Sequence, residues 1–219
     1  MGEKIKEEEL KYLKMLSEKF PTVQSVCTEI INLKAILNLP KGTEHFLSDL
    51  HGEYESFIHI LNNASGVIKN KIDELYSNNM SKEERKRLAT LIYYPEEKLK
   101  QIKEEIKSKG KDINEYYRIT LYRLIDLCKV IASKYSRSKV RKAIPKGYEY
   151  IIDELLHSNQ EIEDKKFYYN QIVNTIISLN RAESFIIAFS ELIKQLAIDH
   201  LHIIGDIYDR GPRATYYFR

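Results

Sequence analysis

Residues 202–211 of the chain, His202-Ile203-Ile204-Gly205-Asp206-Ile207-Tyr208-Asp209-Arg210-Gly211, decide the fold. The short apolar run from His202 to Gly205 predicts a buried strand that ends in Gly-Asp. Gly205 lets the backbone come close to a bound ion, and Asp206 stands where ligands converge in open α/β sheets. With the Gly, Asp and Arg content of this chain, five fixed residues at this spacing arise by chance in roughly two chains in 100,000.

A second motif lies far upstream, in Ser48-Asp49-Leu50-His51-Gly52. The preceding segment, 44–48, predicts another strand, which ends at Asp49. If the chain turns at Gly52, Asp49 and His51 converge on one side and suit Mn, Fe or Zn better than Ca. An Asp-x-His pair is expected by chance roughly 0.25 times in a chain of this composition. Alone it is equally the pattern of a turn Asp before a surface His, so its weight comes from the downstream motif.

Together the two motifs predict half of a two-metal phosphate-cleaving site. One carboxylate such as Asp206 can bridge two metals about 3.5–4 Å apart, and such a pair clamps both oxygens of an in-line phosphoryl displacement. Asp209 is placed to orient a catalytic histidine, and Arg210 offers a planar fork for phosphate oxygens. We expect Asp49, His51 and Asp206 to be metal ligands. Asp209 and Arg210 are the expected catalytic residues, with Arg210 also binding substrate.

The rest of the chain shows helical periodicity. Two helices are expected at 3–19 and 22–38, with Pro21 suited to a helix start. Further helices are expected at 53–62, after a capping box at Ser81–Glu84, from Pro95 to near Gly110, and at 112–135, 145–157, 166–179 and 182–200.

Asp49 and Asp206 are 157 residues apart, whereas a crossover unit needs about 30. We therefore predict an α/β fold that is mostly α by content, in which two core strands flank a large all-helical insertion. The expected parts are N-terminal helices at 1–40, a partial α/β core at 41–65 and 200–219, and the insertion at 66–199.

Composition limits the class of protein. Hydrophobic residues make up 43% and charged residues 31% of the 219, and the net charge of +3 is too small to argue for nucleic acid or a membrane surface. The start of the chain has no apolar core of a signal peptide, and the run Phe185–Phe189 is too short to span a bilayer. Cys27 and Cys128 lie in apolar helical patterns and are expected to be buried thiols. We expect a cytoplasmic protein.

The combination of SDLHGEYE and GDIYDRG resembles the metallophosphoesterases, which include the serine/threonine protein phosphatases. The resemblance assigns Asp49 and His51 to a first metal, Asp206 to the bridge, Asp209 to orienting a histidine and Arg210 to the substrate phosphate. With the long helical insertion and the two-helix lead, residues 5–213 look like the class 3 fructose-1,6-bisphosphatases of Firmicutes-type bacteria. This likeness implies hydrolysis of the sugar phosphate fructose 1,6-bisphosphate in gluconeogenesis, with Mn²⁺ as the metal.

The family pattern continues through an Asn-His motif and further histidines, whereas only eight residues follow Gly211 here, none of them Asn, His, Asp or Glu. We expect this chain to be an N-terminal portion, inactive alone and binding one metal weakly at best. Uncovered sheet edges favour self-association into a homo-oligomer or pairing with the missing remainder. Two alternatives stay open. One is another metallophosphoesterase, such as a serine/threonine protein phosphatase, and the other is a helical interaction fragment without catalysis.

Overall fold

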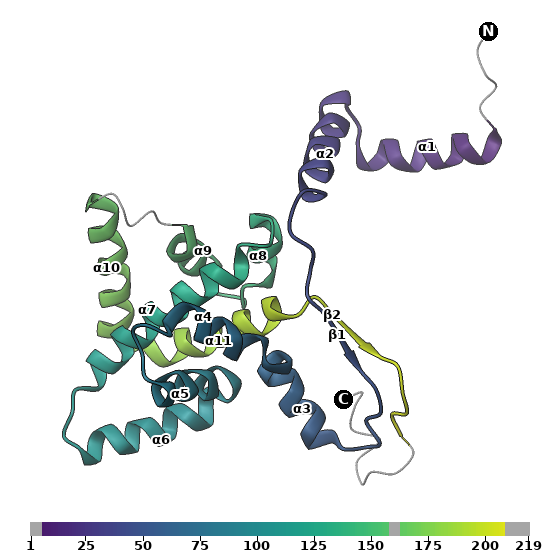
Figure 1. Ribbon diagram of the computed structural model, residues 1–219. Coiled ribbons are helices and arrows are strands. Elements are labelled where there is room, and N and C mark those ends of the chain that lie inside the picture. The colour runs from purple at the N-terminus through teal and green to yellow at the C-terminus, as the bar shows by residue number, and fades with distance from the viewer. Residues whose placement is uncertain (1–5, 158–162, 209–219) are drawn as a thin grey trace. The chain divides into compact units, whose positions relative to one another are not determined.

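A computed structural model of the chain describes residues 6–157 and 163–208. It contains two compact units, Met1–Pro40 and Lys41–Arg219 (Figure 1). The finer division of the second unit, into a partial core and an insertion at 66–199, stays a prediction.

The first unit contains α1 (Glu7–Lys19) and α2 (Val23–Ile36). Pro21 does not open α2, as the sequence suggested, because Thr22 is the N-cap and forms a capping box with Ser25. Neither helix contains a buried residue.

The second unit contains two parallel strands, β1 (Glu44–Leu47) and β2 (His200–Ile203). Their register pairs Glu44 with His200 and Leu47 with Ile203, so the carboxyl ends of both strands lie side by side. This confirms the two predicted strands and shows that they are adjacent, but β2 begins two residues earlier than the apolar run indicated. The preceding helix ends at Ala197, since Ile198 already has extended backbone angles.

The expectation that the second strand is buried is wrong. The residues of β1 and β2 are exposed or half-buried, and Phe46 is 60% exposed. The physical reason is that, among the described residues, β1 and β2 pair only with each other. The apolar run in the sequence indicated a strand that is buried on both faces. Such burial requires packed layers on each side of a parallel sheet.

Helices connect the two strands, and nearly all fall where the periodicity placed them. They are α3 (Tyr54–Asn63), α4 (Val67–Tyr76), α5 (Lys82–Tyr93), α6 (Pro95–Ser108), α7 (Ile113–Ala132), α8 (Arg137–Ala143), α9 (Glu149–His157), α10 (Glu163–Ser178) and α11 (Ala182–Ala197). The Ser81–Glu84 capping box and Pro95 at a helix start are confirmed. α4 and α8 lie in the expected helical stretch, although neither was predicted as a separate helix, and α9 begins at Glu149 because Pro145 belongs to the preceding turn.

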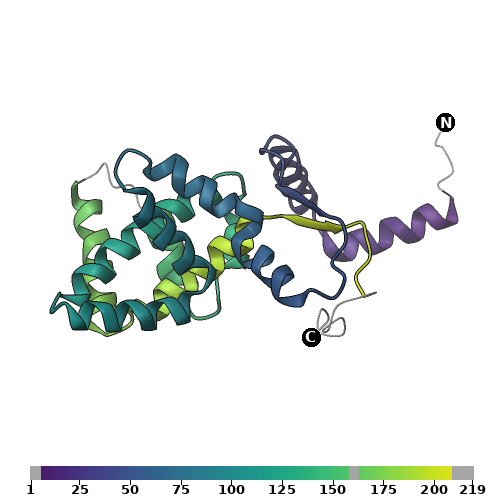
Figure 2. The ribbon, with the colours of Figure 1, turned by 60° about the horizontal axis from the view of Figure 1, so that its bottom comes forward.

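The hydrophobic core extends from Ala64 to Ala197 and is built around α11. This helix packs against α7, α5, α6 and α4 and then leads into β2 (Figure 2). Ile186, Phe189 and Leu192 of α11 are completely buried. Cys128 of α7 is buried as expected, but Cys27 is exposed, because α2 has no buried face.

No single helix among the described residues is long and apolar enough to cross a membrane. One pair of helices, Lys165–Ser178 and Ala182–Ala197, is together long and apolar enough by length and composition alone. The two helices are bent by 117° relative to each other.

Candidate metal site at the strand ends

The loops that follow β1 and β2 are hydrogen-bonded to each other. The Asp206 N–H donates to Asp49 Oδ1 at 3.1 Å, and the Leu50 and His51 N–H groups donate to the Asp206 carbonyl oxygen at 2.7 and 3.1 Å. The Gly52 N–H donates to the Ile207 carbonyl oxygen at 2.9 Å. Each loop therefore holds the other in place, and two sequence motifs 157 residues apart form one structural unit.

Gly205 lies where the two loops come closest. A side-chain carbon at Gly205 would collide with Asp49 Oδ1 and would lie 2.7 Å from the Ser48 carbonyl carbon. Real side-chain carbons do not approach backbone atoms so closely, so only glycine fits here. The structure therefore shows a close approach at Gly205, but to the Asp49 loop, and the approach to a bound ion that the sequence suggested stays a prediction.

The turn after Asp49 takes an uncommon backbone conformation. His51 has φ of 47° and Gly52 has φ of 71°, both in the left-handed region. Gly52 adopts this without strain, whereas a histidine there costs free energy that the surrounding contacts must supply. The turn expected at Gly52 is thus confirmed, and it begins one residue earlier, at a predicted metal ligand.

The structure describes three of the five predicted site residues. Asp49 and Asp206 are exposed and adjacent, and His51 is half-buried in the same loop. Asp209 and Arg210 lie outside the described residues. Within the described ranges, no three His, Cys, Asp or Glu side chains are grouped closely enough to hold a metal ion. The metal-ligand roles therefore stay predictions.

The chemistry of the donors nevertheless fits a divalent transition metal. Two carboxylates and one imidazole, contributed by two loops, form a set that suits Mn²⁺, Fe²⁺ or Zn²⁺. Gly205 allows the loops to stay in contact, and the hydrogen bond from the Asp206 N–H to Asp49 Oδ1 keeps these two residues adjacent at the carboxyl ends of the strands.

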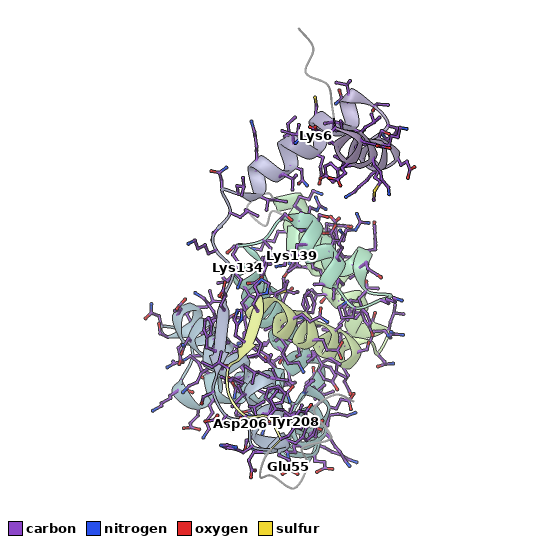
Figure 3. All side chains as sticks on the ribbon, turned by 90° about the vertical axis from the view of Figure 1, so that its right-hand side faces the viewer. Lys6, Glu55, Lys134, Lys139, Asp206 and Tyr208 are labelled. Carbon is purple, nitrogen blue, oxygen red and sulfur yellow. The ribbon has the colours of Figure 1, made fainter. Side chains whose placement is uncertain are left out.

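A second polar cluster lies at the opposite end of the strands, and the sequence did not reveal it. Asp199 accepts hydrogen bonds from the Thr43 N–H at 2.8 Å, from Lys134 Nζ at 3.1 Å and from Lys139 Nζ at 2.6 Å. We call these four residues the Asp199 network. Figure 3 labels Lys134 and Lys139 near the start of the strands, with Asp206 and Tyr208 beyond their other end.

The Asp199 network connects the start of both strands to the helices. Thr43 immediately precedes β1, Asp199 precedes β2, Lys134 follows α7 and Lys139 belongs to α8. Burial of the Asp199 carboxyl raises its pKa, but the hydrogen bonds from Lys139, Thr43 and Lys134 help to outweigh this effect. Together they hold the pKa of Asp199 well below its usual value, so the carboxylate stays charged.

The sequence profile of the Firmicute fructose-1,6-bisphosphatases matches residues 11–217, nearly the whole chain. This chain belongs to that family. The match includes both strand-end loops and the helices between them.

Curated relatives carry the same family name. "Fructose-1,6-bisphosphatase class 3" of Clostridium acetobutylicum is 60% identical over 213 residues, covering 97% of this chain and 31% of the relative. The protein of that name from Clostridium novyi (strain NT) is 59% identical over 206 residues, covering 94% of this chain and 30% of the relative. The chain thus spans about a third of the length of these relatives. No solved structure matches it.

Proposed function

We propose that this chain carries part of the active site of a class 3 fructose-1,6-bisphosphatase, which hydrolyses fructose 1,6-bisphosphate to fructose 6-phosphate and phosphate. One observation carries the proposal. Asp49 and Asp206, 157 residues apart, are joined at the carboxyl ends of adjacent parallel strands in a chain of this family.

Each strand-end residue has a role in this proposal. Asp49 and His51 would hold one Mn²⁺ ion, and Asp206 would be a ligand shared with a second. When bound, such a metal pair stabilises developing negative charge and activates water. Gly205 keeps the two loops close enough for both to serve one centre. Asp209 orients a histidine, and Arg210 binds the substrate phosphate through its planar guanidinium.

We also propose a substrate class, a pathway and a cellular location for the protein. A small-molecule sugar phosphate is the partner of the site, and neither nucleic acid nor a membrane is required. The reaction belongs to gluconeogenesis, and the location is the cytoplasm.

A chimera tests the proposal. This chain replaces the matching part of the Clostridium acetobutylicum relative, to which it is 60% identical, and hydrolysis of fructose 1,6-bisphosphate is followed with Mn²⁺ present. We expect turnover by the chimera and a loss of at least about 100-fold in kcat for Asp206→Asn, because a metal-bridging oxygen is removed. Asp126→Asn is the control, since Asp126 lies on α7, away from the strand ends.

Two results would count against the proposal. Normal turnover of the Asp206→Asn chimera removes Asp206 from the chemistry. Faster hydrolysis of phosphopeptides than of fructose 1,6-bisphosphate instead favours a protein phosphatase.

A further inference from the structure

α2 and its C-cap residue, Leu37, expose a continuous apolar stripe. The stripe residues follow each other at alternating steps of three and four, and their side chains are 40% exposed or more: Val23 81%, Val26 40%, Ile30 46%, Leu33 51% and Leu37 83%. The polar residues Ser25, Thr28 and Asn32 lie on the opposite side of the helix. A helix of 14 residues without a buried face is marginal in water, so its stability depends on a partner for this stripe.

The spacing is that of a two-stranded coiled coil. When Val23, Ile30 and Leu37 take the first position of the heptad, Val26 and Leu33 take the fourth. β-branched residues at the first position with leucine at the fourth favour two strands over three or four. Two of the three first-position residues are β-branched, and Leu33 is a fourth-position leucine.

Charged residues beside the stripe specify the orientation of two such helices relative to each other. Glu29 lies along one border and Lys34 along the other, five residues later. In a parallel pair, a side chain at the Glu29 position faces the partner residue five positions further on, which is Lys34. An antiparallel pair instead places Glu29 against Glu29. Within the described residues, no ion pair involves either side chain.

We propose that α2 is a dimerisation helix that binds α2 of a second copy of this chain as a parallel, in-register coiled coil. The stripe of each copy packs against the same stripe of the other copy, and two Glu29–Lys34 ion pairs flank this contact. This inference does not depend on the metal site or on the reaction.

Sedimentation equilibrium of the 219-residue chain, from about 1 to 200 µM, measures the dimer directly. We expect a monomer–dimer equilibrium, and Ile30→Asp raises its Kd by at least about 30-fold because a charge enters the centre of the stripe. Ile31→Asp is the matched control. Ile31 is equally apolar and 68% exposed but lies off the stripe, so its Kd stays within about twofold.

Two further variant sets test orientation without depending on Ile30. Glu29→Lys and Lys34→Glu each weaken the dimer roughly fivefold, and the double exchange restores it. In a Cys27→Ser background, Val26→Cys forms a covalent dimer on mild oxidation, since fourth-position residues of parallel helices meet. Ser25→Cys, on the outer side of the helix, does not.

Other results would overturn the proposal. A chain that stays monomeric, while Ile30→Asp lowers the Tm of the whole protein, means that another part of the same chain covers the stripe. A dimer that is indifferent to both Ile30→Asp and the charge exchange uses a different surface.

Discussion

The Asp199→Asn variant probes what fixes the start of the two strands. Asn has nearly the shape of Asp, so the exchange removes the negative charge and little else. The side chain of Asp199 is 5% exposed and that of Lys134 is 18% exposed, so this ion pair is shielded from water. The side chain of Lys139 is 56% exposed, which weakens its contribution.

These exposures determine how much folding stability the Asp199→Asn variant is expected to lose. The Lys134 ammonium loses its charged partner but keeps Thr43 Oγ1 at 2.8 Å and the Ala197 carbonyl oxygen at 3.5 Å, so the cost is below that of a fully orphaned charge. We assign about 1.5 kcal/mol to this bond and about 0.5 kcal/mol to the exposed Lys139 pair. The sum of about 2 kcal/mol corresponds to a fall in Tm of roughly 4–8 °C for a body of this size.

Acid should abolish the difference between wild type and variant. The pKa of Asp199 is held below its ordinary value of 3.8, so folding favours the ionised form. A depressed carboxyl contributes stability above its unfolded pKa and loses it as the pH falls through the folded pKa. The gap in Tm is therefore constant above about pH 5 and narrows below pH 3.8, because Asn does not titrate.

Thermal unfolding followed by circular dichroism at several pH values is the assay. Glu74→Gln is the control, because it removes the exposed Lys71–Glu74 pair and costs at most about 0.5 kcal/mol. If Asp199→Asn unfolds within about 1 °C of wild type at pH 7, the carboxylate does not stabilise the start of the strands. If the gap in Tm persists unchanged well below pH 3.8, the gap does not come from the charge of Asp199.

Two further predictions concern the site and the thiols. Gly205→Ala forces the strand-end loops apart and lowers the free energy of unfolding by about 1–3 kcal/mol. An unchanged urea unfolding curve would show that the loops can move apart at little cost in free energy. Cys27, which is exposed, reacts with a thiol reagent in the native protein, whereas burial raises the pKa of Cys128 to about 12 and protects it. One thiol per native chain and two in denaturant are expected, and two at equal rates in the native protein would contradict the packing of α7.

The sequence predicted the elements well because their signals are local. Helical periodicity, the Ser81–Glu84 capping box and Pro95 each act within one or two turns. The strand-end motifs were equally readable, since Gly205 and its neighbours must satisfy a close backbone approach that few residues allow.

Burial and long-range pairing were not readable from local patterns. Leu201 and Ile203 of β2 are apolar, but their exposure depends on which elements cover the sheet. Cys27 has the same apolar surroundings in sequence as Cys128, yet only Cys128 lies in a core. The Asp199 network joins residues from four separate segments, and no spacing in the sequence connects them.

The proposed metal centre at the strand ends consists of Asp49, His51 and Asp206. Titration of Mn²⁺ into the 219-residue chain, followed by the electron paramagnetic resonance signal of free Mn²⁺, tests it most directly. We expect one weak Mn²⁺ site in the wild type, which is lost in Asp206→Asn and retained in Asp126→Asn. Equal Mn²⁺ binding by wild type and Asp206→Asn would contradict it.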